Sequence, residues 1–106
     1  MKLAVIISVN DAETCWNAFR YANYSLGQRD EVKIFLISKG VEYEKVSNEK
    51  YNTIEQGEKF LQSGGKIYAC GTCIKSREQK ETNLCPVSSM KDLYEIVKES
   101  DKVVTF

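Results

Sequence analysis

Apolar, β-branched segments alternate with amphipathic segments along this chain, and that order constrains its fold more than any other feature. The segments 2–9 and 32–38 are almost continuously apolar, as in strands that are covered on both faces. The pattern predicts strands at residues 2–9, 32–38, 66–70 and 102–106, and helices at about 11–26, 52–63, 72–80 and 89–97. Such alternation favours right-handed crossovers, and so an α/β fold with a parallel sheet and helices on both faces.

Length and composition narrow the classes of protein further. The chain has 106 residues, which suits a single domain over residues 1–106 without an internal linker or repeat. Fifteen basic residues balance fifteen acidic ones, so the basic surface of a nucleic-acid-binding protein is not expected. No apolar run approaches the roughly 20 residues needed to cross a bilayer. No export signal is recognisable at the start, and together these observations predict a cytoplasmic protein without a membrane partner.

Residues 68–77 carry the strongest chemical signal in the sequence. Cys70 and Cys73 are spaced C-x-x-C where the third strand is expected to pass into a helix. Reactive groups collect at the carboxyl ends of parallel strands, and the first amides of a helix stabilise a thiolate. In a reducing cytosol, such a pair is more often redox-active or metal-binding than a structural disulfide. Cys70 is therefore the candidate nucleophile.

The neighbours of Cys70 suggest how its thiolate could be supported. The supporting groups are backbone amides or positive charges of Gly71, Thr72, Cys73, Lys75 and Arg77. Glycine at position 71 would also let another backbone or a ligand approach closely. Cys73 has two interpretations that the sequence leaves open: a second reacting thiol, or a helix residue turned into the core.

The remaining cysteines and the polar strand ends have weaker signals. Cys85 lies in an expected loop, where it is a candidate relay thiol or simply a packing residue. Cys15 lies on the apolar stripe of the first helix, which predicts core packing. Asn10, Asp11 and Ser38 follow the first two strands and could line one cleft with the thiols. Helix capping and turn formation explain these three polar residues more simply.

Two helix starts can be predicted from capping patterns. Asn10 with Glu13 resembles a capping box for the first helix, and Ser89 with Asp92 resembles one for the last.

Several kinds of site lack the residues that they require. A structural zinc site needs four ligands, but the chain has one C-x-x-C pair and no histidine. Cys70, Cys73 and Cys85 would need Cys15 or a carboxylate as a fourth ligand, so neither a metal nor another cofactor is expected. The lack of histidine also excludes Cys-His and Ser-His-Asp catalysis. No glycine-rich phosphate-binding motif is present.

The chain resembles the DsrE/DsrF-like family, which includes small sulfur-relay proteins. The resemblance covers nearly the whole length and depends above all on residues 67–77, Ile-Tyr-Ala-Cys-Gly-Thr-Cys-Ile-Lys-Ser-Arg. It also depends on the first strand followed by Asn10 and Asp11, on the strand at 32–38, and on the ending at 90–106. Two departures are Glu78, where many relatives have glycine, and Cys73, which sulfur-relay members often lack.

The resemblance implies a three-layer α/β/α fold with a mostly parallel sheet of four or five strands. It implies a homo-oligomer, trimeric or hexameric. It also implies that Cys70 carries sulfur as a persulfide, and that Arg77 matches the basic residue that the family has seven positions after this cysteine. The leading hypothesis is a sulfur carrier or sulfurtransferase whose donor and acceptor proteins are unknown. The alternatives are a non-catalytic assembly or regulatory module, and a dithiol oxidoreductase that uses Cys70 and Cys73.

Overall fold

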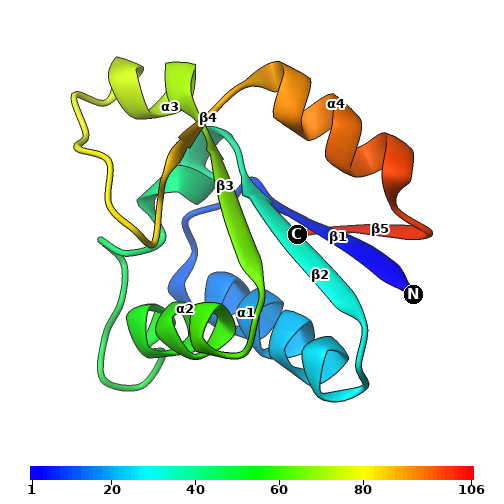
Figure 1. Cartoon of the computed structure of the whole chain (residues 1–106). Helices are drawn as coiled ribbons and strands as arrows, with labels where there is room; N and C mark the ends of the chain where they lie inside the picture. Colours follow the sequence, from blue (N-terminus) through cyan, green and yellow to red (C-terminus); the bar gives the residue numbers. More distant parts are fainter.

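The computed structural model describes residues 1–106, and its centre is a five-stranded sheet with every strand parallel to its neighbours. The strand order is β4-β3-β2-β1-β5 (Figure 1). The strands are β1 (Lys2–Ile7), β2 (Glu31–Leu36), β3 (Lys66–Cys70), β4 (Val87–Ser88) and β5 (Lys102–Thr105). This arrangement confirms the expected α/β class and the parallel sheet.

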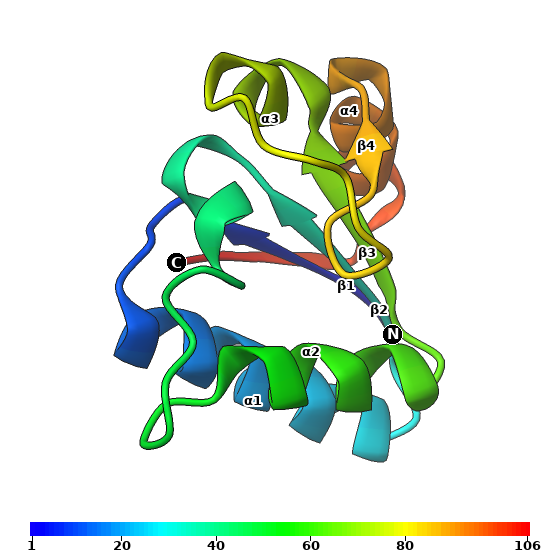
Figure 2. The ribbon, with the colours of Figure 1, turned by 90° about the vertical axis from the view of Figure 1, so that its left-hand side faces the viewer.

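Helices cover both faces of the sheet, as the alternating sequence pattern predicts. The α-helices are α1 (Ala12–Gly27), α2 (Thr53–Gln62), α3 (Gly71–Ser76) and α4 (Met90–Glu99). Figure 2 shows α1 and α2 side by side below the sheet and α3 and α4 above it. A short 3₁₀-helix, η1 (Ser38–Glu42), follows β2 directly. The molecule is therefore the three-layer α/β/α fold that the family resemblance implies. None of the helices combines the length and the apolar character that a membrane-spanning segment requires.

The core is divided by the sheet into two clusters. Alternate residues of a strand point to opposite faces, so Val5 joins the larger cluster, which also contains Phe19 of α1 and Phe60 of α2. Ala4 points the other way and joins a smaller cluster with Phe35, Cys70 and Ile96. The end of β3 follows the same rule, because Ala69 belongs to the larger cluster and Cys70 to the smaller one. Strand pleating thus places the candidate nucleophile on the α4 face.

Two local expectations are wrong. Asp11, rather than Asn10, caps α1, because the Asp11 carboxylate accepts a hydrogen bond from the Thr14 amide at 2.9 Å. The helix expected over residues 72–80 ends at Ser76, and Glu78 then adopts a left-handed conformation with φ of 51°. The last helix does begin with the expected capping box of Ser89 and Asp92.

The loop before α4 contains a strand that the sequence pattern does not reveal. Val87 and Ser88 form β4, a two-residue edge strand whose residues pair with Ala69 and Cys70. A Cβ atom on Gly71 would lie 3.1 Å from the Ser88 carbonyl oxygen and from a Val87 methyl group. Glycine at position 71 therefore leaves room for the backbone of β4 to approach.

Candidate functional site

Cys70 lies at the junction of β3 and α3, which are joined without a loop. It is the last residue of β3 and the N-cap of α3, and it is 8% exposed. Its sulfur accepts a hydrogen bond from the main-chain amide of Cys73 at 3.4 Å. Because α3 has only six residues, this amide contact is a more specific source of thiolate stabilisation than the helix dipole.

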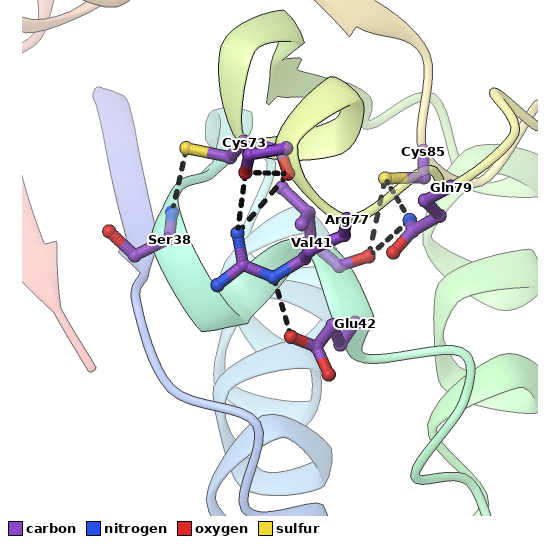
Figure 3. Close-up of polar contacts among 8 residues, drawn as sticks. Ser38, Val41, Glu42, Cys73, Arg77, Gln79 and Cys85 are labelled. Atoms are coloured by element: carbon purple, nitrogen blue, oxygen red, sulfur yellow. Dashed lines mark hydrogen bonds and ion pairs between the residues drawn. The ribbon is translucent and has the colours of Figure 1, made fainter.

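Cys73 lies one turn further along α3 and is less buried than Cys70. Its sulfur accepts a hydrogen bond from the main-chain amide of Ser38 at 3.2 Å (Figure 3). Burial raises the pKa of Cys73 above its ordinary value, and a hydrogen bond with the Cys70 thiol raises it further. The Ser38 amide and the charge of Arg77 act in the opposite direction, because both favour the thiolate.

Arg77 ties α3 to η1. Its Nε donates to the Glu42 carboxylate at 2.6 Å, and one of its terminal nitrogens donates to the Cys73 carbonyl oxygen at 3.1 Å. The guanidinium lowers the pKa of Glu42, with a smaller contribution from a hydrogen bond to Asn10. The positive charge of Arg77 is therefore partly neutralised by Glu42, and Arg77 holds the backbone of Cys73 rather than that of Cys70.

The other predicted supporting residues have fewer contacts. Thr72 and Lys75 are exposed, and neither side chain makes a hydrogen bond or an ion pair. Asp11 caps α1. Ser38 reaches the site through its main-chain amide rather than through its hydroxyl.

Cys85 lies in the larger core cluster, whereas Cys70 lies in the smaller one. The Cys85 sulfur contacts the Val41 carbonyl oxygen at 3.6 Å and the Gln79 amide nitrogen at 3.8 Å. Figure 3 shows the Cys73 sulfur directed toward Ser38 and the Cys85 sulfur directed toward Val41 and Gln79. Burial raises the pKa of Cys85 to about 12. The structure therefore brings Cys70 and Cys73 together but encloses Cys85 in the larger core cluster.

Cys15 is enclosed in the same large cluster, as its place on the helical stripe predicts. It is fully buried, and its thiol donates to the Val9 carbonyl oxygen at 3.2 Å. Burial raises its pKa to about 11. No group of three or more cysteine or carboxylate side chains is arranged to hold a metal ion, because the cysteines are divided between the two clusters.

The thiols do not border any of the three cavities of the molecule. The largest, of about 520 Å³, lies between α1 and α2 on the opposite side of the sheet. No cavity therefore leads to Cys70, which is 8% exposed, or to Cys73, which is partly exposed, so a sulfur that exchanges with them must be presented from outside. Reasoning from the sequence missed Glu42, which lies in a segment with no clear pattern.

Comparison with known proteins agrees with the three-layer fold and with the sequence resemblance. The model of the DsrE/DsrF-like family matches residues 1–106. The chain belongs to this family.

Two uncharacterized relatives and two solved structures illustrate the similarity. An uncharacterized protein of Methanocaldococcus jannaschii is 37% identical, with both chains fully covered. An uncharacterized protein of Methanopyrus kandleri is also 37% identical over 89% of this chain and 83% of its own. The crystal structure of YchN from E. coli matches with a TM-score of 0.84 and 22% identity over the whole of both chains. A conserved protein of unknown function from Bacteroides thetaiotaomicron matches with a TM-score of 0.80 and 25% identity, over 99% of this chain and 94% of its own.

Proposed function

We propose that this protein is a cytoplasmic sulfur carrier in which Cys70 accepts a sulfane sulfur and passes it on as a persulfide. The observation that carries the proposal is the placement of Cys70 at the end of β3. Its sulfur accepts a hydrogen bond from the Cys73 amide, and the Cys73 thiol lies beside it. An amide donor favours the charged form of sulfur, whether that form is a thiolate or a persulfide anion. Membership of the DsrE/DsrF-like family, to which sulfur-relay proteins belong, supports the same chemistry.

The transfer is a nucleophilic attack of one sulfur on another. The Cys70 thiolate attacks the outer sulfur of a donor persulfide, R–S–SH, and a bond forms between the two sulfurs. The S–S bond of the donor breaks, the donor leaves as the thiolate R–S⁻, and Cys70 becomes the persulfide Cys70–S–SH. An acceptor thiolate then attacks the outer sulfur in the same way and regenerates Cys70.

Cys73 offers a second route for release. Its thiolate attacks the inner sulfur of the Cys70 persulfide, the two cysteines form a disulfide, and hydrosulfide, HS⁻, leaves. The outer sulfur is reduced as the two thiols are oxidised, so a dithiol reductant must reopen the disulfide before the next cycle. Lys75 is exposed next to the site and would attract an anionic persulfide donor.

Because no cavity leads to the thiols, they suit donors and acceptors that present their sulfur at an exposed position, as a protein-borne persulfide does. A small molecule that needs an enclosing pocket suits these thiols less well, because no cavity borders Cys70 or Cys73.

A non-catalytic assembly module is the second candidate function, and an exposed apolar stripe favours it. Met90, Tyr94 and Val97 lie on one face of α4 and are 62%, 65% and 41% exposed. Large exposed apolar side chains in a row mark interaction surfaces. The stripe also supports the trimer or hexamer that the family resemblance implies, and the zero net charge does not oppose self-association.

Sulfur loading distinguishes the two functions. The reduced protein and its Cys70→Ser and Cys73→Ser variants are incubated with glutathione persulfide and weighed intact by mass spectrometry. Cys73→Ser should gain one sulfur atom, the parent should gain one sulfur atom or lose two hydrogens as the Cys70–Cys73 disulfide, and Cys70→Ser should gain little. A Cys73→Ser variant that takes up no sulfur, or a Cys70→Ser variant that loads as readily as Cys73→Ser, contradicts the carrier function. Loss of oligomers after Met90→Lys with sulfur uptake unchanged would separate assembly from sulfur chemistry.

A further inference from the structure

Ser38 has an unusual backbone conformation at the point where the chain leaves β2. Its φ is 54°, in the left-handed region that residues other than glycine rarely adopt. This conformation is unfavourable for an L-residue, because its Cβ atom comes too close to the following carbonyl oxygen. Three non-glycine residues in the protein have positive φ, and Ser38 is the one whose amide contacts a cysteine sulfur.

The residues on both sides hold Ser38 in this conformation. Ile37 is extended, and its amide donates to the Ile7 carbonyl oxygen at 3.0 Å, so the chain stays on the sheet up to that residue. Two residues after Ser38, Gly40 lies so close to β1 that a Cβ atom there would be 2.0 Å from the Ile7 carbonyl oxygen. The Gly40 amide also donates to the Ile37 carbonyl oxygen at 2.9 Å. The chain must therefore turn sharply at Ser38.

The turn directs the Ser38 amide at Cys73. The donor nitrogen lies 3.2 Å from the Cys73 sulfur, within the range for a hydrogen bond to sulfur (Figure 3). A second link between the same two elements is the Glu42–Arg77 ion pair, in which Arg77 also holds the Cys73 carbonyl oxygen. η1 thus contacts Cys73 through a donor on its sulfur and, by way of Arg77, through a donor on its backbone.

We propose that Ser38 is the positioning residue for Cys73: its left-handed backbone places an amide on the Cys73 sulfur and keeps that partly buried thiol reactive toward Cys70. The inference names the second reacting sulfur of the proposed carrier, and to that extent it rests on the proposed function. The contact between Ser38 and Cys73 can be tested without sulfur transfer. A glycine could adopt the same turn, whereas a β-branched residue could not do so without strain.

The groups that face Cys73 have opposing effects on its pKa. Burial and the Cys70 thiol favour its neutral form, whereas the Ser38 amide and the Arg77 guanidinium favour the thiolate. Glu42, on η1, faces Arg77 and weakens the effect of that charge. A variant that turns the Ser38 amide away removes one of the two stabilising groups and leaves the others in place.

The test uses the Cys70→Ser background, in which serine still offers an oxygen to the Cys73 amide and one accessible thiol remains. The rate of Cys73 alkylation by iodoacetamide is measured against pH for Ser38, Ser38→Gly and Ser38→Val. Ser38→Gly should keep the pH profile of the parent. Ser38→Val should move the profile to higher pH and give about tenfold less thiolate at neutral pH, since a hydrogen bond to a charged group is lost. Identical profiles in three folded variants would overturn the proposal.

A measurement on the native chain covers the case in which Ser38→Val fails to fold. The amide resonance of Ser38 is followed by ¹H–¹⁵N NMR while pH is raised through the titration of Cys73. A Ser38 resonance that shifts with the same midpoint as Cys73 alkylation supports the contact, and a resonance that does not move overturns it. Neither readout involves sulfur loading, so the proposed function and this inference can fail separately.

Discussion

Cys70 and Cys73 accept hydrogen bonds from main-chain amides at the end of β3, whereas Cys15 and Cys85 lie in the large core cluster beside main-chain carbonyl oxygens. An amide donor stabilises a thiolate, and a carbonyl acceptor stabilises a thiol. The core pair is also completely buried, which further opposes charge and, at Cys85, outweighs a long contact with the side-chain amide of Gln79. The comparison teaches that the hydrogen-bond partner, in addition to burial, separates cysteines suited to chemistry from cysteines that pack.

The largest difference between the pair Cys70 and Cys73 and the pair Cys15 and Cys85 should appear in the rate at which their thiols are alkylated. Burial raises the pKa of Cys15 to about 11 and that of Cys85 to about 12, from an ordinary value of 9.0. The thiolate fraction at neutral pH should therefore be about 100-fold and 1000-fold below that of an ordinary thiol. Iodoacetamide labelling of the native protein, mapped by peptide mass spectrometry, should modify Cys70 and Cys73 first. In denaturant all four cysteines should react alike, and equal labelling of the folded chain would remove the distinction.

Gly40→Ala should disrupt η1, the segment that contacts one cysteine of each pair. η1 supplies the Ser38 amide to Cys73 and the Val41 carbonyl oxygen to Cys85. An added Cβ atom would collide with the Ile7 carbonyl oxygen, so η1 must move or the sheet must open. We expect a loss of about 3 kcal/mol or more in the free energy of unfolding, measured in urea. Gly27→Ala, where an added Cβ atom meets nothing within 4 Å, is the matched control and should change stability little.

Serine substitutions should distinguish the pairs by stability. Cys85→Ser puts a hydroxyl into a fully buried site whose polar contacts, at 3.6 and 3.8 Å, are too long for a hydroxyl, and should lower the free energy of unfolding by about 1–2 kcal/mol. Cys70→Ser keeps an N-cap that helices prefer and should change stability by less than about 0.5 kcal/mol. A Cys70→Ser variant that loses as much stability as Cys85→Ser would indicate that Cys70, too, is mainly a packing residue.

The smallest expected effect on stability concerns the Glu42–Arg77 ion pair, which links α3 to η1. Because Arg77 lowers the pKa of Glu42 in the folded state, the contribution of the ion pair to the free energy of unfolding is fully present above pH 4.5, the ordinary pKa of the carboxyl group. It is lost as pH falls through the lower, folded value. Both side chains are about one quarter exposed, so the pair should contribute about 1 kcal/mol or less. Urea unfolding of Glu42→Gln should match the parent at acidic pH and fall below it at neutral pH; a constant difference across pH would contradict this role.

The sequence pattern predicts the fold well because the strands β1, β2, β3 and β5 are apolar runs and the helices have apolar stripes. It misses β4, which is two residues long and is paired through backbone contacts that no side-chain pattern records. It also extends α3 too far, because the left-handed turn at Glu78 has no glycine to signal it.

The candidate site is predictable only in part. The C-x-x-C spacing locates Cys70 and Cys73 correctly at the end of β3, since local sequence determines that junction. The contacts with Ser38 and Glu42 depend on how η1 packs across the ends of β1 and β3, which is a tertiary property. Cys85 lies twelve residues after Cys73, and only the structure reveals that it is enclosed in the other cluster.

The most direct test of the carrier function is to locate the transferred sulfur in the native chain. The reduced parent is loaded with glutathione persulfide, its persulfides are trapped by alkylation, and the peptide that contains Cys70 and Cys73 is sequenced by tandem mass spectrometry. The account predicts the extra sulfur on Cys70, or a Cys70–Cys73 disulfide once hydrosulfide has left, with Cys15 and Cys85 unmodified. Extra sulfur on Cys85, or a Cys70 peptide with neither extra sulfur nor a disulfide to Cys73, would contradict it.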